Sequence, residues 1–222
     1  MDEVSPTQPG NFKDEWGPMD DVRPVFSTGV GINEETIQAI SRAKHEPQWM
    51  LDLRLQAYQI YQSMPMPSFG PDLSEIDLNE IKYFQRATDH IARNWEDVPD
   101  EIKTTFERIG VPEAERKYLA GSAAQYESEA VYHNLKQDLE SQGIIFMDTD
   151  SALKQHPELV RQYFGKLIAA SDNKFAALNT AVWSGGTFLY VPKNVHADVP
   201  IQSYFRINAG RTGQFERTLI IV

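Results

Sequence analysis

Residues 174–222 read KFAALNTAVWSGGTFLYVPKNVHADVPIQSYFRINAGRTGQFERTLIIV, and this stretch decides the fold class. Short runs with apolar residues at alternate positions are separated by Gly185-Gly186, Pro192 and Pro200, which is typical of strands joined by turns. The pattern predicts strands at about 175–183, 187–191, 201–207 and 215–222. Their regular spacing suits a sandwich, a barrel or a β-solenoid, and spacing alone does not separate these architectures.

The final run, Leu219-Ile220-Ile221-Val222, consists of apolar residues only. A strand of this composition needs a neighbouring strand and a covering layer to remove its edge and one face from water. We therefore expect this chain to be the front part of a longer protein. We also expect it to associate with other chains through this edge when it is alone.

The region before the strands has a helical pattern. Residues 1–25 are rich in Pro, Gly, Asp and Glu and are predicted to be a disordered acidic tail, whereas residues 26–172 are predicted to be mainly helical and 173–222 to begin the strand-rich core. Asn33 is an expected N-cap. Further helices are expected from Pro47 to about 64, from Pro99 to Gly110, from Pro112, over 122–141 and over 157–168. The apolar run 144–147 fits a strand or a buried turn.

Composition excludes several classes of protein. The net charge of −11 argues against a general binder of nucleic acid or of anionic membranes. The chain has no cysteine, which excludes disulfides, a thiolate metal site and a cysteine nucleophile within it. The N-terminus has neither a basic nor an apolar signal region, and no apolar run is long enough to span a membrane, so the expected location is the cytoplasm.

Arg206 and Asn208 are the candidate functional pair. They are two positions apart on the predicted strand 201–207, so their side chains emerge side by side on one face. If this face lines an interior passage, the pair can hold an anionic or polar species. The alternative is an ordinary solvent-facing arginine, which is the commoner situation on an exposed strand face.

No other residues form a recognisable catalytic or metal site. His133 and His196 lack a second histidine or a carboxylate at metal-ligand spacing. Glu127 and Glu129 fall on different faces of the expected helix, which makes them a poor acid–base pair. Trp183 is expected to be a core residue beside a turn. With no nucleotide-binding loop and no set of nucleophile and base, we expect a protein that is not an enzyme.

Several phrases together resemble SufB, a family of scaffold subunits in the SUF machinery for iron–sulfur cluster assembly. The phrases are HEPQWMLDLRLQAY (45–58), LAGSAAQYESEAVYHN (119–134), DTDSALKQHPELVRQYFGKLI (148–168), KFAALNTAVWSGGTFLYVPKNV (174–195) and IQSYFRINAGRTGQFERTLII (201–221). They stand in the family's order and cover about residues 26 to 222. The SufD paralogues share the fold but less of this wording.

The resemblance implies an α+β fold in which a helical N-terminal region leads into the first turns of a right-handed parallel β-helix, here truncated. It implies a SufC-type ATPase, SufD and sulfur donor proteins as partners of the complete protein. No cofactor is expected in this chain, whereas the complete complex would carry an iron–sulfur cluster and, in some complexes, a reduced flavin. The family's cysteine-bearing second half is missing, so the chain alone is expected to be inactive.

The resemblance also bears on the candidate pair. It places Arg206 and Asn208 where the family keeps polar residues that face the interior of the β-helix, along a proposed route for sulfur. A guanidinium would stabilise an anionic sulfur species there. The alternatives are a SufD-like paralogue, a fragment of a β-helix enzyme that acts on carbohydrates, and the remnant of a truncated or split gene.

Overall fold

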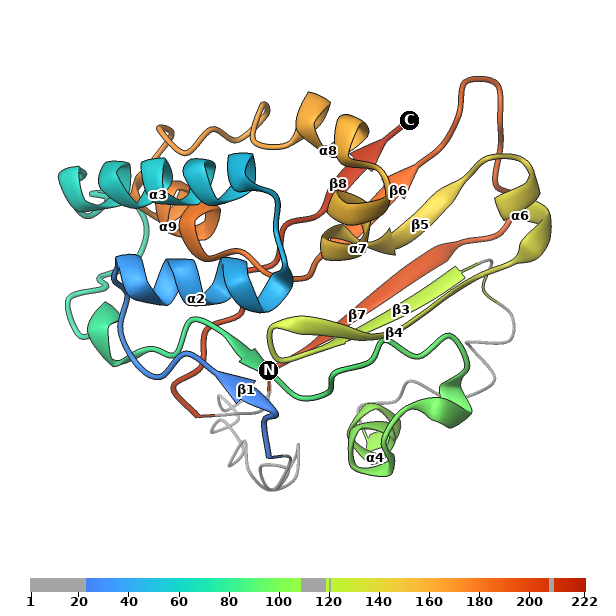
Figure 1. Cartoon of the computed structure of the whole chain (residues 1–222), viewed down its shortest axis with the longest axis horizontal. Helices are drawn as coiled ribbons and strands as arrows, with labels where there is room; N and C mark the ends of the chain where they lie inside the picture. Colours follow the sequence, from blue (N-terminus) through green and yellow to red (C-terminus); the bar gives the residue numbers. More distant parts are fainter. Residues whose placement is uncertain (1–22, 109–118, 120, 208–209) are drawn as a thin grey trace, which may run out of the picture.

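The computed structural model describes residues 23–108, 119, 121–207 and 210–222, and within them it shows an α+β arrangement of helices and small sheets (Figure 1). The helices are α2 (Glu34–Lys44), α3 (Gln48–Ser63), α4 (Asp100–Arg108), α6 (Gln137–Ser141), α7 (Thr149–Gln155), α8 (Pro157–Tyr163) and α9 (Lys174–Val182), with 3-10 turns η1 (Leu78–Glu80) and η2 (Trp95–Asp97). The strands are β1 (Phe26–Ser27), β2 (Gln85–Arg86), β3 (Gly121–Tyr126), β4 (Glu129–Leu135), β5 (Ile145–Asp148), β6 (Thr187–Tyr190), β7 (Ile201–Arg206) and β8 (Leu219–Ile221).

Two three-stranded sheets form the centre of the described structure, with strand orders β4-β3-β7 and β5-β6-β8. Each contains one antiparallel pair and one parallel strand added at its edge: β7 runs parallel to β3, and β8 runs parallel to β6. The chain therefore leaves the second sheet after β6, passes through β7 in the first, and returns as β8 beside β6. The chain thus makes one full coil, which passes through both sheets and returns to the strand next to its start.

Apolar side chains from both sheets meet between them. The buried members of this inter-sheet cluster are Ala123, Leu135, Leu139, Ile144 and Phe146, and Leu189 and Ile201 pack against them. Polar contacts also cross the gap, because the hydroxyl of Thr187 on β6 donates to that of Ser203 on β7 at 2.8 Å. The two sheets are thus held together by side chains of both kinds.

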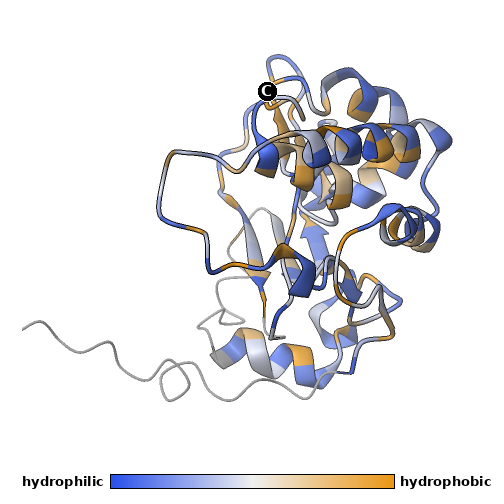
Figure 2. Cartoon of the chain, turned by 90° about the vertical axis from the view of Figure 1, so that its left-hand side faces the viewer, coloured by the Kyte–Doolittle hydropathy of each residue, from blue (hydrophilic) through white to orange (hydrophobic). Residues whose placement is uncertain are grey.

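The outer faces of the sheets are covered by helices. Helices α3, α7 and α8 lie over β5-β6-β8, where Met50, Leu153, Val160 and Phe188 are buried. Helix α4 covers the outer face of β4-β3-β7 through Ile102 and Phe106, which contact Ala124, Tyr126 and Val131. Figure 2 shows the helices with hydrophobic and hydrophilic residues side by side, as expected for amphipathic elements. No helix of the described residues is long and apolar enough to cross a membrane.

Helices α2 and α3, which pack with α9 in one layer, confirm the N-terminal part of the helix prediction. Asn33 caps α2, since its side-chain oxygen accepts a hydrogen bond from the amide of Thr36 at 2.8 Å. Helix α3 begins directly after Pro47. The helices pack through a cluster that includes Ile37, Ile40, Ala57, Leu178 and Val182.

The prediction of a helix over 122–141 is wrong. Residues 121–135 form the β3–β4 hairpin, with Glu127 at φ 57° in its turn, and only α6 at the end of the range is helical. All six residues of β3 are buried, so its sequence lacks the polar alternation of a half-exposed strand. Val131, Leu135 and Leu139 are spaced as on one face of a helix, but Val131 and Leu135 belong to β4 and Leu139 belongs to α6.

The prediction of a strand at 175–183 is also wrong, because this segment is α9. Asn173 caps it by accepting hydrogen bonds from the amides of Phe175 and Ala176 at 2.9 and 3.0 Å. Ala176 to Val182 are almost all buried, and a helix that is apolar on every side shows no helical period. The strands predicted at 187–191 and 201–207 are confirmed, and the strand predicted at 215–222 is restricted to 219–221.

Other predictions are settled in part. The run 144–147 is a strand, β5, and the helix expected over 157–168 ends at Tyr163. Residues 26–172 therefore contain β3, β4 and β5 as well as helices, and the description of this part as mainly helical stays a prediction. The tail up to residue 22, the helix end at Gly110 and the helix from Pro112 lie outside the described residues. The boundary at 173 stays a prediction, although β3 and β7 pair across it.

Gly185 and Gly186 join α9 to β6 in a conformation that only glycine adopts easily. Their φ angles are 68° and 84°. A Cβ at Gly186 would lie 2.4 Å from the carbonyl oxygen of Arg217, and one at Gly185 would lie 2.3 Å from Oε1 of Gln125. That Oε1 instead accepts a hydrogen bond from the amide of Gly186 at 2.7 Å, which ties the turn to β3.

Candidate functional site

Arg206 lies at the end of β7, directly opposite Tyr126 of β3. Strand alternation puts it on the same face as Tyr204, which packs against the α4 cluster, whereas Ser203 on the other face contacts Thr187 of the second sheet. Arg206 is partly buried on the face covered by α4, and its carbonyl oxygen accepts from the amide of Glu127 at 2.9 Å. Asn208 lies outside the described residues, so the pairing of the two side chains stays a prediction.

A buried cluster of charges lies where α2, α3 and α7 meet the end of α9. Arg54 binds the carboxylate of Glu46 through Nε at 2.8 Å and Nη2 at 2.6 Å, and both side chains are almost completely buried. Lys44 forms an ion pair with Asp150 and lies 3.8 Å from Glu46. Nearly every charge in this ionic cluster thus faces an opposite charge, as buried ions require.

The ionic cluster is organised around Trp183, which is fully buried, as the sequence predicted for a core residue. The Lys44 ammonium and the Arg54 guanidinium lie 4.1 and 4.8 Å from the centroid of its indole ring. Its carbonyl oxygen accepts from Lys44 at 3.1 Å and from Arg54 at 2.8 Å. Trp183 ends α9, so these cations stabilise the carbonyl end of a helix.

A polar pocket of about 340 Å³ opens beside the ionic cluster. Its charged lining residues include Arg86, Glu129, Asp148, Asp150 and Lys154. Arg86 donates to both carboxylate oxygens of Glu129 and to the carbonyl oxygen of Ala43. Oδ1 of Asp148 caps α7 by accepting from the amide of Ser151 at 2.8 Å, while its buried Oδ2 has no hydrogen-bond partner among the described residues.

The carboxyl groups in and beside this pocket differ in the direction in which their pKa values are shifted. Burial, together with the charge of Asp150, raises the pKa of Asp148 above its ordinary value of 3.8. Burial also raises the pKa of Glu129, despite its hydrogen bond to Arg86. Burial opposes the ionisation of Glu46 too, but Arg54 and Lys44 outweigh it and hold the pKa of Glu46 below 4.5. Such divergent pKa values are common at functional sites and in structural ion networks.

The remaining sequence candidates lie apart from one another. His133 is on β4 rather than on a helix, and burial lowers its pKa. His196 is exposed in the loop between β6 and β7, 3.4 Å from a carboxylate oxygen of Asp198. Within residues 23–108, 119, 121–207 and 210–222, no three His, Cys, Asp or Glu residues are arranged to hold a metal ion.

Sequence reasoning missed the ionic cluster altogether. Glu46 and Arg54 belong to the phrase HEPQWMLDLR, and Lys44 directly precedes it. In isolation these residues resemble the surface charges of an amphipathic helix pair, because nothing in local spacing shows that Asp150 and Trp183 will lie beside them. One signal was available: Arg54 lies at helical spacing from Met50 and Tyr58, on the face of α3 that the apolar residues bury.

Comparison with known proteins agrees with the resemblance at the level of the family. A family model described as the SufBD protein N-terminal region matches residues 33–203. Proteins named iron-sulfur cluster assembly SufBD family protein are similar over 212 residues, with 56% identity in Staphylococcus epidermidis, 54% in Staphylococcus haemolyticus and 53% in Staphylococcus aureus. Each alignment covers 96% of this chain and 45% of the relative, so the chain spans less than half the length of these curated relatives. The chain therefore belongs to the SufBD family.

Proposed function

We propose that the complete protein to which this sequence corresponds acts as a SufB-type scaffold in iron–sulfur cluster assembly. The proposal rests on the family match and on the printed names of the relatives. In this proposal the protein binds rather than transforms its cargo, works in the cytoplasm with a SufC-type ATPase, SufD and a sulfur donor, and receives its cluster outside residues 1–222. The cluster, and a reduced flavin where one is present, belong to the complete complex.

The coil formed by β6, β7 and β8 is the observation that carries the proposed architecture. Phe188 on β6 pairs with Leu219 on β8 in parallel register, after the chain has passed through the other sheet. A right-handed parallel β-helix is built by repeating such coils. Phe205 and Ile220, on the inward faces of the two edge strands, are 38% and 59% exposed, and a further coil would cover them.

Arg206 is proposed to steady an anionic sulfur species in the complete protein. It is an arginine held at the edge of β7 beside a buried tyrosine, Tyr126, where a guanidinium interacts more strongly with an anion than it does in open water. The resemblance implies that Arg206 faces the interior of the β-helix, but in the described residues it lies on the face under α4, opposite the inter-sheet cluster. The sulfur route of this proposal therefore runs along the α4 side of β7.

The test uses the full-length gene product purified with its SufC-type ATPase and SufD. Arg206→Ala is expected to reduce cluster formation from a sulfur donor and ferrous iron several-fold, while the circular dichroism spectrum is unchanged. The control is Arg161→Ala, which removes an exposed arginine on α8. Wild-type assembly by Arg206→Ala would overturn the proposed role of this residue.

The choice of SufB over the SufD paralogue has its own test. After anaerobic reconstitution, a SufB-type full-length protein should retain iron and sulfide in stoichiometric amounts. Residues 1–222 alone should retain neither, because they lack the thiolates that hold such clusters. A full-length protein that binds the ATPase but no cluster would instead support the SufD-like alternative.

A further inference from the structure

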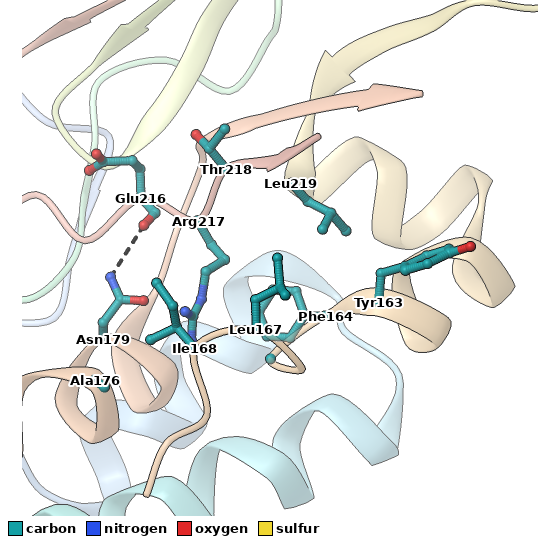
Figure 3. Close-up of a pocket in the computed structure, with 11 residues that line it drawn as sticks. Tyr163, Phe164, Leu167, Ile168, Ala176, Asn179, Glu216, Arg217, Thr218 and Leu219 are labelled. Carbon is teal, nitrogen blue, oxygen red and sulfur yellow. Dashed lines mark hydrogen bonds between the residues drawn. The ribbon is translucent and has the colours of Figure 1, made fainter. Parts of the chain in front are cut away.

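A cavity of about 370 Å³ lies between the segment that follows α8, helix α9 and the extended segment that leads into β8 (Figure 3). Its volume falls in the range of small-molecule sites. The wall is mainly apolar and includes Tyr163, Phe164, Leu167, Ile168 and Leu219. Figure 3 shows these side chains converging from separate segments, with Asn179 and Arg217 on the side opposite Tyr163.

Two aliphatic side chains at the rim of this cavity are open to water. Leu167 is 97% exposed and Ile168 is 57% exposed. Adjacent large aliphatic residues left in water favour association with an apolar group, since burying them removes apolar surface from solvent. The rim therefore suits the hydrocarbon part of a ligand.

Arg217 supplies a positive charge to the same cavity. Its Nη2 donates to the hydroxyl of Thr180 at 2.6 Å, and its guanidinium carbon lies 5.2 Å from the centroid of the Phe164 ring. Among the described residues its buried Nε has no acceptor, and no carboxylate lies within ion-pair distance. Burial, with the nearby charge of Arg54, lowers the pKa of Arg217.

This arginine contrasts with Arg54 and Arg86 in the described structure. Arg54 and Arg86 each bind a carboxylate with two nitrogens. Arg217 is partly buried with the same fork of donors, but it has a hydroxyl and an aromatic ring in place of a carboxylate. A buried guanidinium of this kind is complementary to a carboxylate from outside the described chain.

Asn179 adds a second polar group. Its Nδ2 donates to the carbonyl oxygen of Glu216 at 3.2 Å, which fixes the amide beside the segment that carries Arg217 (Figure 3). Its Oδ1 is buried without a hydrogen-bond partner in the described part of the chain. This amide therefore forms part of the cavity wall beside Arg217, while its buried oxygen is closed to solvent.

We propose that this cavity binds a small amphipathic carboxylate, with its carboxylate on Arg217 and its hydrocarbon tail on Leu167, Ile168 and Leu219. The inference uses none of the residues assigned to sulfur transfer and is independent of the proposed role in cluster assembly.

The first experiment titrates the full-length gene product, labelled at its methyl groups, with octanoate and follows the leucine and isoleucine methyl signals by NMR. Octanoate is expected to saturate a site that shifts the signals of Leu167 and Ile168. Octanol, which has the tail but no charge, and acetate, which has the charge but no tail, should each bind at least tenfold more weakly. Equal affinity for octanol and octanoate, or no saturable shift with octanoate, would overturn the proposal.

Two variants and a control separate recognition from folding. Arg217→Met should weaken octanoate binding at least tenfold while leaving octanol binding unchanged. Leu167→Ser changes a side chain that is almost fully exposed, so it should fold normally and weaken octanoate binding several-fold. The control, Arg211→Met, removes an exposed arginine paired with Glu80 and should bind octanoate as the wild type does. If Leu167→Ser and Arg211→Met both bind octanoate with wild-type affinity, the cavity is not the site.

Discussion

The ammonium of Lys44 lies 4.1 Å from the centroid of the Trp183 ring and donates a hydrogen bond to the carbonyl oxygen of the same residue at 3.1 Å. These two contacts fix the last residue of α2 against the end of α9, although the residues are far apart in the sequence. Lys44 also neutralises Asp150, whose Oδ2 accepts from the amide of Gly185 at 2.7 Å. One side chain therefore connects a helix end, a buried tryptophan and the glycine turn.

Lys44→Met should destabilise the fold by about 3 kcal/mol, because it leaves the Asp150 carboxylate without its counter-charge in a largely buried position. The free energy of unfolding can be measured by urea denaturation followed by tryptophan fluorescence. Lys193→Met, at an exposed position in the loop between β6 and β7, is the control and should change stability by less than about 0.5 kcal/mol. Equal effects of the two changes would show that the ionic cluster contributes no more than a surface lysine does.

Asp148→Asn should stabilise the chain near neutral pH. The folded state raises the pKa of Asp148 above 3.8, so the folded state loses stability as pH rises from that value through the raised pKa. Asparagine removes the buried charge and still caps α7. The gain should shrink as the pH falls toward the ordinary pKa of an aspartate.

Urea denaturation at a series of pH values measures this difference. Asp138→Asn, at an exposed position on α6, should show no comparable change with pH. If Asp148→Asn stabilised the chain equally at every pH, the buried charge of Asp148 would not be the cause, because an effect of that charge must change with pH.

Gly186→Ala should cost about 3 kcal/mol or more. The residue has φ 84°, and an added Cβ would lie 2.4 Å from a backbone carbonyl oxygen that cannot rotate away. Gly165→Ala measures the cost of the positive φ without a steric clash. Gly165 also has a positive φ, 71°, but no heavy atom lies within 4 Å of the added Cβ. This substitution should cost about 1 kcal/mol. The two thermal unfolding curves should differ clearly, and coincident curves would exclude a steric role for the turn.

Ile220→Lys should reduce self-association of the chain. Ile220 is 59% exposed on β8, which lies at the edge of its sheet in the described structure, and a lysine on an edge strand opposes pairing with another strand. Size-exclusion chromatography over a range of concentrations measures the effect. Ile76→Lys, at a half-exposed isoleucine away from this sheet, is the control. A wild-type chain that stays monomeric at high concentration would refute the predicted association.

The sequence predicted those elements whose start or end depends on residues next to them in the chain. The cap at Asn33, the helix start after Pro47 and the strands after Gly185-Gly186 and Pro200 all depend on neighbouring residues. The β3–β4 hairpin and α9 were misassigned because both are buried on nearly every side. A segment without a polar face shows neither the helical nor the strand periodicity of hydrophobic residues, so its sequence alone does not distinguish a helix from a strand. In these two segments tertiary packing determines which one forms.

The candidate site was less predictable for a related reason. The face on which Arg206 lies follows from simple alternation along β7, but only the contacts of Tyr204 and Ser203 reveal what covers each face. The free donor of Arg217 could not be inferred at all, since it depends on Thr180 and Phe164, which come from other elements.

The parallel pairing of β3 with β7 has a consequence for synthesis on the ribosome. Gly121 pairs with Ile201, so the outer edge of β3 stays open until about 80 more residues have been translated. The β3–β4 hairpin can form early, whereas closing so long a loop is slow and leaves an unpaired edge available to other chains meanwhile. Chaperone dependence during translation is therefore expected to begin when β3 emerges and to end only after β7 has left the exit tunnel.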